Sequence, residues 1–286
     1  MDGAETRKRK AMICSIVAIG ILGVSQVAAQ LIASLLEMIG VPAGVCNILA
    51  GILYIAGTLL IAKYIFERLF HFDLSELGIS KFSLKWKWII ISILLPIAVI
   101  AAYVLFIPGE WVSSDLSVKQ KFELLSAGIF YIGFGAGFVE EIIFRGAIFH
   151  LLKKAWNIKI AVLVPSILFG ILHILGMQFS LGSSILVILA GTAVGIMFSM
   201  ITIESGSVWC SGLVHAMWNA IISGGGLTIA GQPEESSIVT YVLKTNAFAI
   251  SGGEFGIESS IISLMGYVVV ALLALLTIKR RGSINS

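Results

Sequence analysis

Long apolar runs alternate with short polar segments along the chain, and these runs predict transmembrane helices. A bilayer core about 30 Å thick is crossed by about 20 predominantly apolar residues in a helix. The runs cover residues 11–36, 43–65, 88–107, 125–152, 159–178, 182–202, 206–225 and 259–278. The pattern therefore predicts an all-α fold, a polytopic membrane bundle of about eight transmembrane helices.

Two polar segments between the runs are longer than the others. The stretch 66–87 carries four basic residues and is typical of an amphipathic connector. The stretch 226–257 is rich in glycine, and weak alternation within 237–250 favours a short β-hairpin. We expect three parts, which are the N-terminal helices with the connector (1–124), a core (125–222), and an extracytoplasmic loop with the last helix (223–286).

Composition supports a membrane protein and excludes several other classes. The chain of 286 residues is 58% hydrophobic and only 12% charged, whereas soluble domains are about 25% charged. No basic stripe with interleaved aromatic residues appears, so nucleic acid is not an expected partner. Cys14, Cys46 and Cys210 lie in apolar runs without paired spacing, and we expect them to be buried packing residues.

The basic residues predict how the helices are oriented. When eight spans are threaded from a cytoplasmic N-terminus, 15 of the 19 basic residues fall on the cytoplasmic side and three on the outer side. The remaining one, Arg145, lies inside a span. Cytoplasmic loops carry an excess of lysine and arginine. We therefore predict a multi-pass protein of the cell membrane with both termini in the cytoplasm.

Two pairs of glycines are spaced for close helix packing. Gly133 and Gly137 are four residues apart in the fourth run, and Gly191 and Gly195 are four apart in the sixth. Small residues at this spacing let helix backbones approach closely within a membrane. We expect these faces to be helix contacts.

Three charged residues interrupt the fourth run, in the sequence FVEEIIFRGAIF from residue 138 to residue 149. An unpaired charge at the centre of a bilayer costs roughly 2.5–3.5 kcal/mol. Glu141 and Arg145 are four apart, so they share a helix face and can form an ion pair. Glu140 points about 100° away from Glu141. The group is either a structural ion pair with a spare acid or part of a functional site.

Two later runs carry further polar groups at a similar depth. Phe169 and His173 are four apart in the fifth run, and His215 and Asn219 are four apart in the seventh. Counted from the polar ends of their runs, Glu140 and both histidines lie about 17–21 Å into the bundle. A single histidine in an apolar helix is usually a core residue, but three spans with polar groups at one depth indicate a common site.

These residue types suit hydrolysis. Glu140 can act as the general base that activates a water molecule. His173 and His215 can polarise a carbonyl or pass protons, and Asn219 can donate a hydrogen bond to an oxyanion. Glu140, His173 and His215 also match the donor set of a catalytic Zn²⁺ site, so a metal-assisted reaction is an open alternative.

The three motifs together resemble the CPBP family, also called ABI. They are EExxxR (Glu140, Glu141, Arg145), FxxxH (Phe169, His173) and HxxxN (His215, Asn219), and the resemblance covers about residues 125–222. It implies an intramembrane endopeptidase related to the Rce1 prenyl endopeptidase, either of CAAX type or active in bacteriocin and peptide processing. The implied catalytic residues are Glu140, His173, His215 and Asn219, with Glu141, Arg145 and Phe169 in support. The implied partners are a peptide or lipidated protein substrate and the lipid bilayer.

Other protease signatures are missing. The chain has no HExxH and no GxSxG motif, and no paired aspartates occur in the apolar runs. The alternative from another class is a non-catalytic membrane immunity protein or a small proton-coupled carrier that uses the same buried glutamate and histidines. The motifs fix neither the metal nor the oligomeric state.

Overall fold

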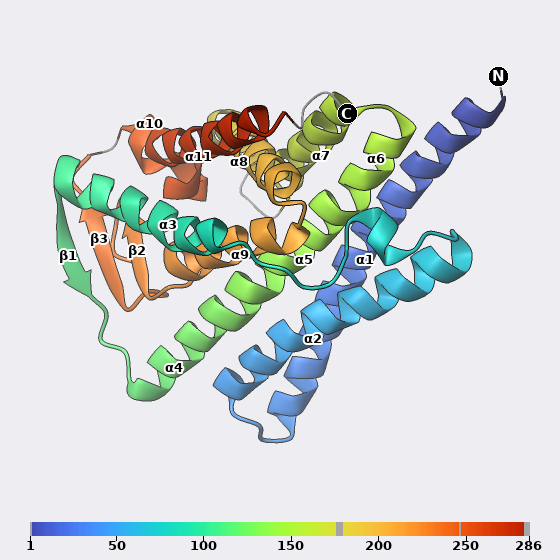
Figure 1. Ribbon diagram of the computed structural model, residues 1–286. Coiled ribbons are helices and arrows are strands. Elements are labelled where there is room, and N and C mark those ends of the chain that lie inside the picture. The colour runs from blue at the N-terminus through green and yellow to red at the C-terminus, as the bar shows by residue number, and fades with distance from the viewer. Residues whose placement is uncertain (1, 176–179, 246, 283–286) are drawn as a thin grey trace.

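The chain folds into a bundle of long helices with a small sheet at one end (Figure 1). The computed structural model describes residues 2–175, 180–245 and 247–282. The predicted all-α class is confirmed. The first two helices, α1 (Asp2–Met38) and α2 (Ala43–Lys63), form an antiparallel pair that flanks one side of the bundle. The connector after them contains η1 (Tyr64–Leu69) and η2 (Leu74–Leu77).

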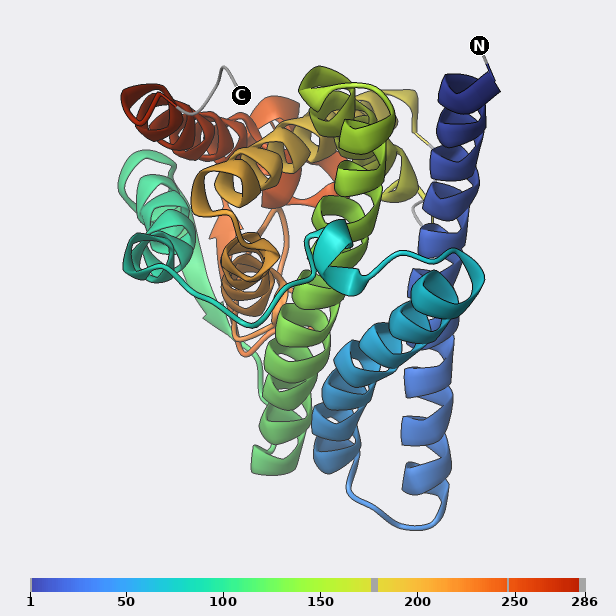
Figure 2. The same cartoon turned by 45° about the vertical axis from the view of Figure 1, so that its right-hand side comes forward.

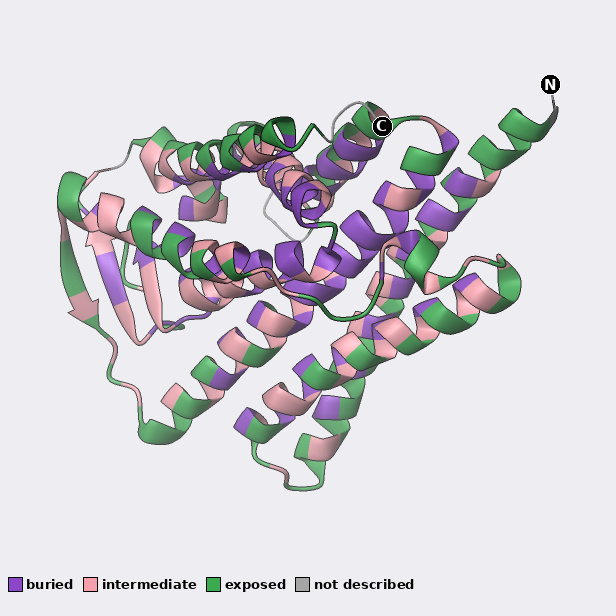
Figure 3. Ribbon diagram, viewed as in Figure 1, coloured by how far each residue is buried: buried purple, intermediate pink, exposed green. Residues whose placement is uncertain are grey.

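A continuous helix from Val118 to Ala155 runs through the middle of the protein. It is longer than the predicted span 125–152, because a turn capped by Ser117 precedes the apolar run. Its segments are α4 (Val118–Ser126), the π-helical η3 (Ala127–Ala136), α5 (Gly137–Glu141), the π-helical η4 (Ile142–Ile148) and α6 (Phe149–Ala155). Figure 3 shows that buried residues concentrate on α5 and α6, while α1, α3 and α11 expose much of their surface.

The remaining helices pack around this central one. They are α3 (Trp86–Phe106), α7 (Ile158–Leu172), α8 (Leu181–Ser205), α9 (Val208–Trp218) with its π-helical continuation η5 (Asn219–Ser223), and α11 (Ile261–Arg280). Helix α9 lies against α5 and η3 on one side and against α3 on the other. Helix α8 contacts α7 and α11.

Within the described residues, six helices are long and apolar enough to cross a membrane, two fewer than predicted. The other two predicted spans, 159–178 and 206–225, form α7 and α9 with η5. Helix α7 has 15 residues, so it is about 22 Å long and shorter than the bilayer core. Residues 176–179 of the predicted fifth span lie outside the described residues. The count of eight is thus approximate. The shorter helix α9 carries His215, and His173 caps the end of α7.

A three-stranded sheet replaces the predicted hairpin. The strands β1 (Gly109–Ser113), β2 (Leu227–Ala230) and β3 (Val239–Leu243) lie in the order β1-β3-β2. The prediction of a hairpin within 237–250 is wrong, because β3 pairs antiparallel with β1 and parallel with β2. Partners so distant in sequence leave no local turn signal. The helical segments α10 (Phe248–Ser251), η6 (Gly253–Phe255) and η7 (Ile257–Ser259) follow the sheet.

The first predicted glycine pair brings the central helix against α9 and η5. A Cβ atom added to Gly137 would lie 2.6 Å from the Cα atom of Ala216, and one added to Gly133 would lie 2.8 Å from the Cβ atom of Ala220. Real side chains do not approach this closely, so only glycine allows this helix spacing. The contact places the backbone just before Glu140 beside the backbone next to His215.

The second pair brings α8 against α7. A Cβ atom on Gly191 would meet the Cα atom of Gly170 at 2.5 Å, and one on Gly195 would meet the Cα atom of Ser166 at 2.8 Å. Both glycine pairs are therefore helix contacts, as their spacing predicted. Together they draw α5, α7, α8 and α9 around one region.

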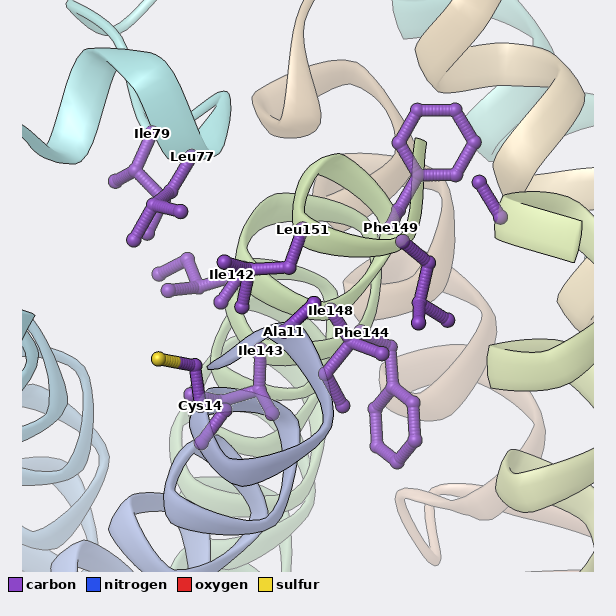
Figure 4. Close-up of a cluster of buried hydrophobic side chains, with 14 of the residues drawn as sticks. Ala11, Cys14, Leu77, Ile79, Ile142, Ile143, Phe144, Ile148, Phe149 and Leu151 are labelled. Carbon is purple, nitrogen blue, oxygen red and sulfur yellow. The ribbon is translucent and has the colours of Figure 1, made fainter. Parts of the chain in front are cut away.

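A hydrophobic core lies where α1, the connector and the central helix meet (Figure 4). Cys14 and Ala11 of α1 pack with Leu77 of η2 and with Ile143 and Ile148 of η4. Each of these side chains is at most 3% exposed. Burial on this scale contributes about 1.5–3 kcal/mol for each large aliphatic side chain, so this cluster fixes the central helix against α1.

All three cysteines are buried and free. Cys14 packs in the cluster of Figure 4, and Cys46 and Cys210 lie in separate clusters on α2 and α9. Their predicted role as buried packing residues is confirmed.

Basic residues tie several helix ends together at one end of the bundle. Lys154 Nζ lies 2.7 Å from Glu76 Oε2, which joins α6 to the connector, and Lys8 Nζ of α1 lies 5.8 Å from the centre of the Trp156 ring. Glu204, whose side chain is 0% exposed, pairs with Lys87 at 2.7 Å and with Arg281 at 2.9 Å. The start of α1 and the end of α11 therefore lie at the same end, as Figure 2 shows.

The arrangement predicts that both termini face the same compartment. Two variants each carry one introduced cysteine, at Glu5 or at Gly282. A membrane-impermeant thiol reagent should label both variants from the same side of sealed vesicles. A cysteine at Gly40, in the α1–α2 loop, should label from the opposite side. The unmodified protein is the control because its own cysteines are buried. Labelling of Glu5 and Gly282 positions from opposite sides would contradict this topology.

Candidate functional site

The charged group of the central helix forms the predicted ion pair. Arg145 Nη1 donates a hydrogen bond to Glu141 Oε1 at 2.9 Å, and both side chains are 0% exposed. Removing one member of such a buried pair typically costs about 3–5 kcal/mol, because the other charge is left unpaired. The four-residue spacing puts both groups on one face of the helix, as expected.

Three aromatic rings surround the Arg145 guanidinium. Its central carbon lies 4.8 Å from the centre of the Phe169 ring, 5.3 Å from that of Phe198 and 5.6 Å from that of Phe144. Cation–π attraction of this kind contributes about 2 kcal/mol when water is excluded. Phe169, the first residue of the FxxxH motif, is thus a support for the ion pair.

His215 lies between the two glutamates. Its Nδ1 atom is 3.2 Å from Glu141 Oε1, and its Nε2 atom is 3.8 Å from Glu140 Oε2. The imidazole stacks on Phe198 at 4.6 Å and meets the edge of Phe169 at 5.8 Å. Because a carboxylate only accepts hydrogen bonds, Glu141 holds the proton on Nδ1 and directs Nε2 toward Glu140.

This contact adds to what the sequence indicated. The spacing in the sequence predicted only an ion pair between Glu141 and Arg145. In the structure, the Oε1 atom of Glu141 contacts both Arg145 and His215. The helix positions placed Glu141 and Glu140 on different faces, but a histidine from another helix fits between them.

His173 reaches the site from the end of α7. The helix ends at Leu172, so His173 is its C-cap and does not lie in mid-span as predicted. Its Nδ1 atom lies 2.7 Å from the carbonyl oxygen of Phe169. A carbonyl only accepts, so Nδ1 carries the proton and Nε2 is left for other partners. The ring also contacts Phe169 at 4.4 Å and Phe255 at 5.8 Å.

Asn219 lies one helical turn after His215, at the start of η5. Its Nδ2 atom donates a hydrogen bond to the carbonyl oxygen of Ile132, at 3.2 Å. This bond uses one of the two amide protons and leaves the other proton and the side-chain oxygen for other partners. The amide is therefore oriented by the central helix.

Glu140, His173, His215 and Asn219 line one cavity of about 220 Å³. The Glu140 side chain is only 20% exposed, and its Oε2 atom has no hydrogen-bond partner among the described residues. A buried carboxylate oxygen without a partner beside an imidazole is a suitable place for a reacting water. The structure thus brings the four predicted catalytic residues to one space, although their roles stay predictions.

A second carboxylate, Glu258, lines this cavity, and no sequence motif indicated it. Glu258 Oε2 accepts a hydrogen bond from Trp218 Nε1 at 3.0 Å, and Glu258 Oε1 accepts one from Ser223 Oγ at 2.7 Å. The hydroxyl of Tyr267 donates to the Glu258 carbonyl oxygen at 3.0 Å. Glu258 lies at the edge of the last apolar run, where an acid is ordinary, so only the fold reveals its position.

The predicted zinc ligands are Glu140, His173 and His215. Their chemistry suits a metal, because each histidine donates from Nδ1 to an oxygen and keeps Nε2 available. However, the part of the chain that the structure describes holds no group of three or more histidine, cysteine, aspartate or glutamate side chains placed to hold a metal ion. A zinc requirement at Glu140, His173 and His215 therefore stays a prediction.

Comparison with known families identifies this part of the chain. Residues 122–221 match the Rce1-like family, described as type II CAAX prenyl endopeptidase Rce1-like. These residues, called the Rce1-like segment below, are similar to that family. The match covers all seven motif residues and confirms the resemblance to the CPBP family. No curated protein matches the chain. The Rce1-like segment holds the catalytic candidates, whereas Phe255, Glu258 and Tyr267 enter the cavity from beyond it.

The ion pair between Arg145 and Glu141 depends on Gly195, whose spacing from Gly191 predicted only a helix contact. A Cβ atom on Gly195 would lie 2.9 Å from Arg145 Nη2 and 2.8 Å from Ser166. Gly195→Ala should therefore lower the free energy of unfolding by about 1–3 kcal/mol through overpacking. Thermal unfolding in detergent, followed by circular dichroism, measures this.

Gly57→Ala is the matched control. Nothing lies within 4 Å of a Cβ atom at this position in α2, so alanine should leave stability unchanged or raise it by about 0.5–1 kcal/mol. A Gly195→Ala protein as stable as the parent would show that Arg145 is not held as tightly as described.

Proposed function

We propose that the protein is an intramembrane endopeptidase in which Glu140 activates water to hydrolyse a peptide bond. The observation that most supports this function is the position of Glu140 Oε2. Among the described residues this atom has no hydrogen-bond partner, and it lies 3.8 Å from His215 Nε2 in a cavity that His173 and Asn219 also line. The Rce1-like family implies a protease of CAAX type, which supports this reaction.

The proposed chemistry begins with a water beside Glu140. The water donates one hydrogen to Glu140 Oε2 and the other to His173 Nε2, which has a free lone pair when Nδ1 is bound to Phe169. The water oxygen then adds to the peptide carbonyl carbon while Glu140 takes a proton. The C–N bond breaks, and Glu140 returns this proton to the leaving nitrogen.

We assign stabilisation of the developing oxyanion to Asn219 and His215. Asn219 offers its second amide proton, and Glu141 holds His215 at Nδ1 so that Nε2 faces the cavity. Because Glu141 holds His215 and the carbonyl oxygen of Ile132 holds Asn219, both side chains are oriented before the substrate arrives. Such preorganised donors each contribute a factor of about 10²–10³ in other hydrolases.

The membrane setting follows from the helices. Six described helices are long and apolar enough to cross a bilayer, and the Rce1-like family supports a multi-pass membrane protein. We propose that the substrate is a membrane-associated peptide or a lipidated protein that enters as an extended segment, either for CAAX-type trimming or for bacteriocin and peptide processing. We also propose that the basic end of the bundle faces the cytoplasm.

Glu140→Gln tests the proposed base. The amide fills the same space but cannot accept the proton, so peptide cleavage should fall at least about 100-fold while thermal unfolding in detergent stays unchanged. Cleavage of a labelled peptide panel by the purified protein is the measurement.

Glu110→Gln is the control, since this glutamate lies on β1 with its side chain 58% exposed. It should retain full activity. If Glu140→Gln also cleaves at the parent rate, the proposed base is wrong. If the parent cleaves no peptide, the non-catalytic immunity or carrier function replaces the peptidase.

A zinc requirement can be tested separately. If zinc assists, the purified protein should contain about one equivalent by elemental analysis, and a chelator should abolish cleavage until zinc is restored. If the chelated, metal-free protein keeps full activity, cleavage needs no zinc and depends on the protein side chains alone.

A further inference from the structure

The catalytic cavity contains a carboxylate that the proposed hydrolysis does not use. Glu258 lines the cavity together with Glu140, and both of its oxygens accept hydrogen bonds from neutral donors, Trp218 and Ser223. No ion pair to Glu258 is found among the described residues, whereas Glu141, Glu204 and Glu76 all have one. Among the described residues, Glu258 is therefore without a cationic partner.

The catalytic helix itself fixes this carboxylate. Trp218 and Ser223 lie three and eight residues after His215 on α9 and η5. With a rise of 1.5 Å per residue, the two donors lie about 4–12 Å along the helix from His215. An extended peptide advances about 3.3 Å per residue. A substrate that runs along α9 and η5 would therefore reach the level of Glu258 within about one to four residues of the bond that Glu140 would cleave.

Among the described residues, histidine is the only basic residue type in the cavity wall. Its described lining contains two glutamates and two histidines but no lysine or arginine. An adjoining cavity of about 210 Å³ shares Ser223, Phe255 and Glu258 with it and adds Glu234, again without a lysine or arginine among the described residues. A substrate segment that passes Glu258 therefore meets negative charge along its path.

We propose that Glu258 is a specificity-determining residue that receives a cationic group of the substrate, a lysine or arginine side chain within about four residues of the scissile bond. This inference rests on the proposed peptidase function. An ion pair in a site with little water strengthens binding of the correct charge and rejects the opposite one.

The test is a peptide set that differs in one position. Apolar peptides carry lysine, glutamine or glutamate at successive positions around one cleaved bond, and kcat/KM is measured for each. For the parent protein, lysine at one of the four nearest positions on one side should exceed glutamine by at least about tenfold, as expected for a hydrogen bond to a charged group. The peptide with glutamate at that position should have the lowest kcat/KM.

Glu258→Gln should lower the lysine-to-glutamine ratio of kcat/KM by about tenfold, mostly through KM, and should relax the discrimination against glutamate. Glu258→Asp keeps the charge and should retain most of the ratio. Glu254→Gln is the matched control, because this exposed glutamate does not line the catalytic cavity. It should keep the parent ratio.

The outcomes separate the two claims. Cleavage without any charge preference in the parent overturns the role of Glu258 and leaves the peptidase intact. An equal loss for the lysine and glutamine peptides in Glu258→Gln means that Glu258 only holds α9 to the loop, and this also overturns the inference. Absence of cleavage for every peptide overturns the proposed function itself.

Discussion

The buried pair between Arg145 and Glu141 is the interaction on which the rest of the site depends. Two charges without any exposure are stable in this position only if each has its partner. Arg145 is held from the sides by aromatic rings on the central helix, α7 and α8. The pair therefore joins three helices, and it fixes the rotation of the helix that presents Glu140.

Glu141 also fixes the orientation of His215. The same oxygen that accepts from Arg145 also lies 3.2 Å from His215 Nδ1, so the pair sets the imidazole plane and its protonated nitrogen. Close packing of Gly137 on Ala216 brings α9 near enough for this contact. The adjacent acids thus have different tasks, because Glu141 belongs to the scaffold and Glu140 faces the cavity.

Local spacing explains what could be predicted from the sequence. The Glu141–Arg145 pair, the shared face of His215 and Asn219, and the glycine contacts all follow from helical periodicity, and the structure contains each of them. The sheet and the cavity role of Glu258 depend on segments that are distant in sequence, so no local pattern indicates them. His173 was placed in mid-helix because an apolar run does not reveal that its helix ends at Leu172.

The central claim is that water, activated at Glu140, attacks the peptide carbonyl directly. A single turnover of cleavage in water enriched in oxygen-18, followed by mass spectrometry of the new C-terminal carboxylate and of the protein, tests it most directly. The account predicts one oxygen-18 atom in the first product formed and none in the Glu140 side chain. A first product without the label, together with oxygen-18 in Glu140, would show attack by the carboxylate itself and would contradict the account.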